Sequence, residues 1–99
     1  MINKKTVFVS LLIASGTASA EQLKGGYPGC ISEDLFDQMV SALVKKDDRA
    51  VGYLLKNGCV MAKSGLPITV LDRGWGTSKV RVYIGDQSVV LWTNSENIQ

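Results

Sequence analysis

The feature that most constrains the fold is a single pair of cysteines, Cys30 and Cys59, in a chain of 99 residues that contains no histidine. The 28 residues between them exclude the Cys-x-x-Cys spacing of redox and metal sites. A disulfide that closes a loop of about 30 residues stabilises a small domain by roughly 3–4 kcal/mol in the chain-entropy picture. We therefore expect a structural disulfide rather than a redox or metal-binding pair.

The first twenty residues, MINKKTVFVSLLIASGTASA, have the pattern of a bacterial signal peptide. Two lysines precede an apolar run, and Ala18-Ser19-Ala20 supplies the small residues that a signal peptidase recognises. The run is too short to span a bilayer, which takes about 20 residues. We expect a signal peptide over residues 1–20 and one mature domain over residues 21–99, exported to the periplasm or secreted. The alternative is an uncleaved N-terminal anchor.

The balance of charge excludes two classes of partner. The chain has 11 Lys and Arg against 9 Asp and Glu, and the predicted signal peptide holds two of the lysines and no acid. The mature domain therefore carries nine charges of each sign. A neutral domain has no net electrostatic attraction for nucleic acid or anionic lipid, so we expect neither as a partner.

Between the cysteines, apolar residues recur at helical spacing. Ser32 can cap a first helix over about 33–46, and a second, shorter helix begins near Asp47 and Asp48 and ends at the Lys-Asn-Gly of 56–58. The string DDRAVGYLLKNGC is also similar to the inner helix of an ankyrin repeat, but no repeat period accompanies it. An antiparallel helical hairpin over 30–59 would bring the two cysteines together.

After Cys59 the period of the apolar residues changes to two, which indicates strands. The predicted strands are 66–71, 78–84 and 88–93, joined by the glycine-containing turns DRGWGT and GDQ, with a short fourth strand at about 60–63. Residues 21–29, EQLKGGYPG, are expected to form an extended arm. The fold class is therefore α+β, a disulfide-closed helical hairpin followed by a small antiparallel sheet.

The segment from Leu66 to Ile98 resembles the bacterial SH3-like (SH3b) domain. The resemblance rests on LPITVLD, a Gly-Trp-Gly loop, KVRV, an aliphatic strand that reaches Trp92, and a terminal SENI. It implies an SH3-like region over 60–99, either as a reduced barrel or as a three- to four-stranded sheet with the helical hairpin as its lid. It also implies binding to peptidoglycan or to proteins, without catalysis. The sequence departs from the family in having Leu91 where a glycine precedes the tryptophan, and the helical hairpin lies outside the family pattern.

Catalytic constellations are not apparent. Serines and threonines have no histidine to activate them, and the paired acids Glu33–Asp34 and Asp47–Asp48 occupy helix starts where caps favour acids. Adjacent helical residues do not face each other, so neither pair has the geometry of a glycosidase. We expect no enzyme, no cofactor and no metal site.

The candidate binding residues are aromatic and basic: Trp75, Arg73, Arg81, Tyr83 and Trp92. Trp75 lies between two glycines in a predicted loop, either as an exposed anchor or as a plug folded over the open end of the sheet. The arginines offer paired donors for a carboxylate. Tyr83 should face outward, and Trp92 should be in the core or half-buried because it ends a nearly continuous apolar run.

The expected function is that of a small exported binding module that contacts an envelope protein or peptidoglycan. The alternative is an inhibitor or immunity protein that inserts a loop into the active site of an exported hydrolase or toxin. A rigid, glycine-flanked loop on a disulfide-closed domain suits both roles.

Overall fold

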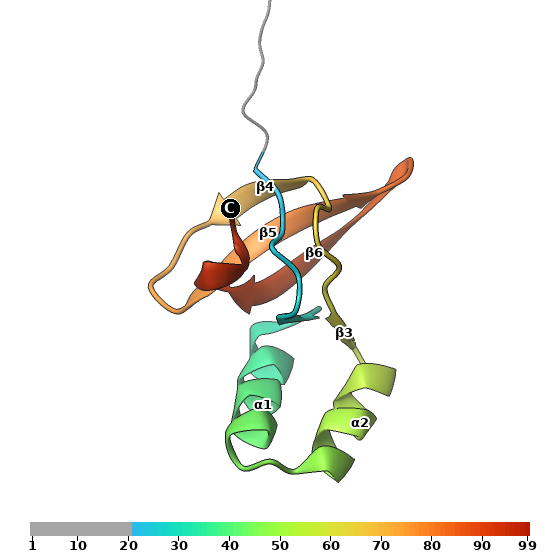
Figure 1. Cartoon of the computed structure of the whole chain (residues 1–99), viewed down its shortest axis with the longest axis vertical. Coiled ribbons are helices and arrows are strands. Elements are labelled where there is room, and N and C mark those ends of the chain that lie inside the picture. Colours follow the sequence, from blue (N-terminus) through green and yellow to red (C-terminus); the bar gives the residue numbers. More distant parts are fainter. Residues whose placement is uncertain (1–20) are drawn as a thin grey trace, which may run out of the picture.

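The computed structural model describes residues 21–99, so the predicted signal peptide lies outside the described residues. Two helices form a hairpin at one end of an open, five-stranded antiparallel sheet (Figure 1). The strands follow the order β3-β2-β6-β5-β4 across the sheet. Their bounds are β2 Pro28–Cys30, β3 Cys59–Met61, β4 Ile68–Asp72, β5 Thr77–Ile84 and β6 Gln87–Asn94, and a short 3₁₀ helix, η3 Ser95–Asn97, follows.

The two helices begin where the sequence places caps. Helix α1, Glu33–Val44, is capped by Ser32, whose hydroxyl accepts from the Leu35 N–H at 3.1 Å. Helix α2, Asp48–Lys56, is capped by Asp47, whose carboxylate accepts from the Ala50 N–H at 3.1 Å. Each cap satisfies a backbone donor that the first turn leaves without a helical partner.

The ends of the helices are set by residues with positive φ. Helix α1 ends two residues earlier than the sequence pattern predicts, because Lys46 adopts a φ of 57°, which a right-handed helix cannot accommodate. Gly58, after α2, has a φ of 111°, and a Cβ there would lie 2.7 Å from a Leu35 methyl carbon. The backbone conformation is what favours glycine at 58, because side-chain-bearing residues rarely adopt this φ, whereas the Leu35 methyl could move aside.

The predicted disulfide is present between Cys30 and Cys59, which face each other on β2 and β3 with their Cα atoms 4.0 Å apart. The Ile31 N–H donates to the Gly58 carbonyl at 2.9 Å, so Ile31 and Gly58 form a hydrogen-bonded pair of the ladder. Because the two kinds of pair alternate along an antiparallel ladder, the neighbouring pair of Cys30 with Cys59 is a non-hydrogen-bonded one. Such non-hydrogen-bonded pairs bring side chains closest together. The disulfide thus closes the helical hairpin at the point where it enters the sheet.

The arm before Cys30 belongs to the sheet, whereas the sequence pattern placed the sheet after Cys59. Strand β2 lies between β3 and β6, and further upstream isolated bridges join Gln22 to Pro67 and Leu23 to Ile98. Within the described residues the sheet therefore has five strands rather than three or four. Short-range periodicity could not find this strand because it has only three residues, two of them Pro28 and Gly29.

The remaining strands form a meander close to the predicted one. Strands β5 and β6 pair over their full lengths from Thr77↔Asn94 to Ile84↔Gln87, leaving Gly85 and Asp86 as a two-residue turn. Gly85 has a φ of 65°, as the first position of such a turn requires. Strand β4 pairs with the other edge of β5, with a register shift between Val70 and Asp72.

The described residues form two hydrophobic cores. The disulfide and the inner faces of both helices form the first: Cys30, Phe36, Met39, Ala42, Leu54 and Cys59. The second lies between the sheet and the arm: Leu23, Ile68, Val80, Val82 and Leu91. Neighbouring residues of β6 contribute to different cores: Leu91 belongs to the second, and Trp92 packs against the first. The helical hairpin therefore extends the sheet at one end rather than covering it as a lid (Figure 1).

Asn97 anchors the chain end to the arm. Its side chain is fully buried, its amide donates to the Thr93 hydroxyl at 3.1 Å, and its amide oxygen accepts from the Gly25 N–H at 2.9 Å. The Thr93 hydroxyl in turn donates to the Pro28 carbonyl at 2.7 Å. These bonds hold arm, β2 and η3 together, and Ile98 returns to pack against the second core.

Replacing both cysteines with alanine should lower the melting temperature of the mature domain by roughly 15–25 °C. The loss follows from about 3–4 kcal/mol of chain-entropy stabilisation in a domain where 1 kcal/mol is worth about 4–8 °C. Differential scanning calorimetry of the double variant and the wild type measures it. Equal melting temperatures would contradict the structural role of the disulfide.

Candidate functional site

The loop between β4 and β5, residues 73–76, presents Trp75 to solvent. The side chain of Trp75 is fully exposed, at 103% of its reference area. The plug over the open end of the sheet is therefore not observed, and the exposed alternative is. A free indole of this size is unusual on a surface, because large aromatic rings gain most from burial.

Hydrogen bonds to two serines fix the backbone of this loop. The Gly74 N–H donates to the Ser78 hydroxyl at 3.2 Å, and the Ser95 hydroxyl donates to the Gly74 carbonyl at 2.8 Å. The two hydroxyl oxygens are 2.7 Å apart. Since each hydroxyl has one proton, Ser78 must donate to Ser95, and the three bonds form a closed ring. The Ser95 N–H also donates to the Gly76 carbonyl at 3.0 Å, so both glycines beside Trp75 are held.

The two glycines are not equivalent. A Cβ on Gly74 would overlap the backbone carbonyl oxygen of Thr77, whereas a Cβ on Gly76 would meet nothing within 4 Å. The tight approach at Gly74 is what allows its backbone to reach both serines. The loop is thus a rigid support for Trp75 rather than a flexible connection.

Arg73, at the start of the same loop, is paired within the chain. Its Nη2 donates to the Glu21 carboxylate at 2.6 Å, with both side chains about half exposed. The pair joins the loop to the arm, whose Glu21 carbonyl accepts from the Ile68 N–H at 3.0 Å. The contact shows that Arg73 can reach a carboxylate in this position, and a partner's carboxylate would compete with Glu21 for it.

The other candidate residues lie along β5. Arg81 and Tyr83 are exposed on the face opposite Val80 and Val82, and the Tyr83 hydroxyl is 2.9 Å from the hydroxyl of Thr69 on β4. Six residues of strand separate Thr77 from Tyr83, which places Tyr83 about 20 Å from the loop end of β5. Arg73 and Trp75 therefore share the loop at one end of β5, whereas Arg81 and Tyr83 lie farther along the strand.

Trp92 is half-buried, within the range that the sequence indicates. It packs against the core that contains the disulfide, and the Lys79 ammonium lies 5.1 Å from its ring centroid. This cation–π contact covers the ring with a side chain of the next strand, since Lys79 and Trp92 are register partners. Trp92 contributes more to the packing of the helical hairpin on the sheet than to an open surface.

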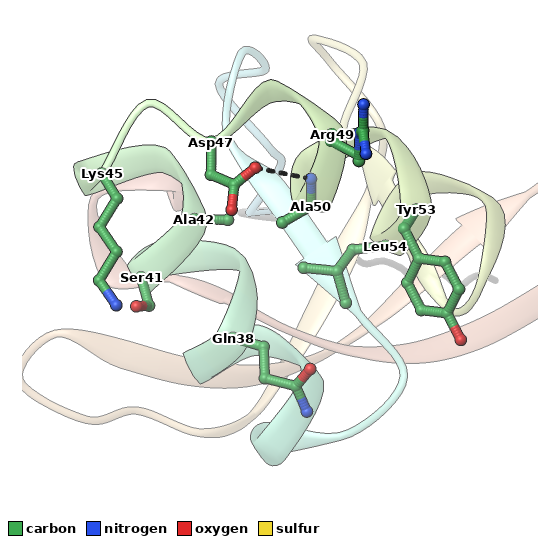
Figure 2. A pocket seen from close by; sticks show the side chains of 9 residues that line it. All are labelled: Gln38, Ser41, Ala42, Lys45, Asp47, Arg49, Ala50, Tyr53 and Leu54. Atoms are coloured by element: carbon green, nitrogen blue, oxygen red, sulfur yellow. Dashed lines mark hydrogen bonds between the residues drawn. The ribbon is translucent and has the colours of Figure 1, made fainter.

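A groove of about 530 Å³ between the two helices was not expected from the sequence. Figure 2 shows Leu54 near its centre, Ser41 and Lys45 on the left, Arg49 and Tyr53 on the right, and Gln38 at the bottom. Asp47 lies between the two cations, but its carboxylate is already bound to the Ala50 N–H (Figure 2). The sequence does place Lys45 and Arg49 on either side of the turn between the helices. This pattern could not have predicted the groove, because charged residues at solvated helix ends look the same.

Within residues 21–99, no group of three or more acidic, cysteine or histidine side chains is arranged to hold a metal ion. Neither helix of this part of the chain is long and apolar enough to cross a membrane. Comparison with protein-family models gave no match, and searches of curated proteins and of solved structures found no significant similarity.

Substituting each of the two loop glycines tests the rigidity of the Trp75 support. Gly74→Ala should destabilise the domain by about 1–3 kcal/mol, because the new methyl group overlaps backbone that cannot move freely. Gly76→Ala is the matched control and should stay within about 0.5 kcal/mol of the wild type. Urea unfolding of both variants measures the difference, and equal effects would contradict the assigned packing.

Proposed function

We propose that the chain is a non-catalytic binding module of an exported protein, and that it docks on an envelope protein with Trp75 as its anchor. The observation that carries the proposal is the full exposure of Trp75 on a loop whose backbone is held on both sides. Interface anchors of this kind are most often Trp, Tyr or Arg, and Arg73 lies beside it in the same loop.

Burial of the indole supplies the driving force. A tryptophan that enters a pocket removes about 150–250 Å² from water, worth roughly 4–6 kcal/mol before the costs of association. Those costs include the ordering of loops at the interface. The ring of hydrogen bonds through Ser78 and Ser95 orders this loop in advance, so most of that cost falls on folding rather than on binding.

The β region is proposed to be SH3-like, in the form of a reduced barrel. Two observations support this. The bridge between Gln22 and Pro67 connects the arm to the segment that leads into β4, and the bridge between Leu23 and Ile98 connects it to the chain end. These contacts link the entry of β4, through the arm, to β2 and to the chain end, and Leu23 of the arm lies in the second core. The loop with Trp75 would then lie at one end of the barrel.

Export, to the periplasm or beyond, is part of the proposal. The Cys30–Cys59 disulfide suits an oxidising compartment, and the first twenty residues have the pattern of a signal peptide. Peptidoglycan is the other surface that such a compartment offers. An aromatic ring can stack on a sugar as well as fill a protein pocket, so the experiment separates the two.

The same loop supports a second candidate function, the inhibition of an exported hydrolase or toxin. A rigid loop that projects one large side chain can occupy an active site without being reshaped by it. A toxin or lysozyme-like gene beside this one, and loss of turnover by its product on addition of the purified domain, would favour inhibition. A neighbouring envelope-assembly cluster would favour the accessory role.

Trp75→Ala tests the anchor. Because the ring touches little of its own chain, the variant should melt within about 2 °C of the wild type while binding falls at least tenfold, as expected for an interface hot spot. Binding is measured by biolayer interferometry against the captured partner and by sedimentation with purified peptidoglycan. Tyr53→Ala, which removes another exposed aromatic from α2, is the control.

The partner itself can be captured with a photo-crosslinking phenylalanine analogue at position 75 and, as control, at position 53. A protein cross-linked from 75 only, and identified by mass spectrometry, supports the proposal. Ser95→Ala should weaken binding of that protein by about threefold to tenfold, because the loop loses part of its support. Unchanged binding by Trp75→Ala to both the protein and peptidoglycan would reject this surface.

A further inference from the structure

A second groove, of about 610 Å³, opens beside the edge strand β3 and does not include Trp75. One wall is formed by residues 58–63 together with Ile31 and Leu55 from the ends of the helical hairpin. The other wall comes from β5 and β6: Val82, Ile84, Val89 and Leu91. In Figure 1, β3 and the projecting β5–β6 hairpin lie on the same side of the molecule.

The lining of this groove is apolar and open to solvent. Four of its large apolar side chains are about half exposed: Ile31, Val60, Met61 and Ile84. They come from three separate parts of the chain, so the exposure is a property of the fold and not of one apolar segment. Contiguous apolar surface of this kind marks interaction sites on small proteins.

Strand β3 offers unpaired backbone groups to the groove. It pairs with β2 alone, and within the described residues no strand lies on its other side. The Gly58 carbonyl accepts from the Ile31 N–H, and the Ala62 N–H donates to the Tyr27 carbonyl. The backbone hydrogen bonds between the two chain segments therefore recur at every second residue. Met61, between them, must direct its N–H and carbonyl outward, since these groups alternate along an antiparallel strand.

The groove also has a charge preference. Lys56 and Lys63 are its charged lining residues, and no acid lies among those that the structure places there. The occupant should therefore combine apolar side chains with acidic ones.

We propose that this groove binds an extended segment of a partner protein, with alternating apolar and acidic residues, as an additional strand along β3. An extended chain satisfies the outward groups of Met61 and places every second side chain against the apolar walls. An acyl chain would fill the groove but leave the strand edge unpaired. A second copy of this domain would bring its own two lysines to the same edge, with no acid to offset them.

A fluorescein-labelled peptide of eight alternating valines and aspartates is the probe, and anisotropy with the mature domain measures its binding. The same peptide methylated on alternate backbone nitrogens keeps the side chains but cannot complete the strand pairing. It should bind at least tenfold more weakly. A valine–lysine peptide should bind more weakly by a similar factor, and added salt should weaken the valine–aspartate complex.

The matched protein variants are Met61→Pro and Met61→Ala. Both shorten the side chain, but only proline removes the outward N–H, and neither breaks a backbone bond to β2. Met61→Pro should lose at least tenfold in affinity and Met61→Ala about threefold or less.

A double charge reversal, Lys56→Glu with Lys63→Glu, should bind the valine–aspartate peptide at least tenfold more weakly. Trp75→Ala should bind this peptide as the wild type does, which separates this site from the Trp75 surface.

Three outcomes would overturn the proposal. The first is equal binding of the methylated and unmethylated peptides to the wild type, a comparison that does not depend on any variant folding. The second is no binding of the valine–aspartate peptide at millimolar concentration. The third is a dimer in sedimentation equilibrium that excludes the peptide and is lost in Met61→Pro, because the occupant would then be a second copy.

Discussion

The structure depends on the pairing of β2 with β3 and on the disulfide that crosses it. Cys30 and Cys59 lie opposite each other at the junction of the helical hairpin and the sheet, and both are fully buried. The link fixes both ends of the helical hairpin at once, so its apolar faces meet the disulfide and Trp92 in one core. A domain this small has little apolar surface to bury, and a covalent constraint on the unfolded chain offsets part of that deficit.

The Trp75 loop is held by parts of the chain that are distant in sequence. Ser95 comes from the turn after the last strand, and Glu21 comes from the arm before the first. The arm and the chain end are in turn held together by Asn97, whose bonds reach Gly25 and, through Thr93, Pro28. The loop that carries Trp75 is therefore held by the same arm and chain end that pack against the second core. Two surfaces result, an aromatic loop fixed by hydrogen bonds and an apolar groove beside a strand edge that is open within the described residues, and both are proposed here as binding surfaces.

Local patterns identified most of the elements. Ser32 and Asp47 cap the helices as their chemistry suggests, and the alternation in 78–84 places Val80 and Val82 in the core. The sequence also pointed to Arg73 and Trp75 as neighbours in one loop. It missed the strand at Pro28–Cys30, because three residues with a proline and a glycine carry no period, and it missed both grooves, because their walls come from segments far apart in the chain. It grouped Tyr83 with Trp75, although the length of β5 keeps them apart.

By itself the sequence determined the α+β class, the helical hairpin and the cysteine pairing, because capping, apolar period and loop closure act over short or covalently defined distances. Only the tertiary structure decided that the arm joins the sheet, that Trp75 points into solvent, and that β3 is an open edge among residues 21–99. These features depend on which backbone donors and acceptors find partners across the whole chain. Whether each donor and acceptor has a partner is decided by the whole fold, so it cannot be predicted from a short window of neighbouring residues.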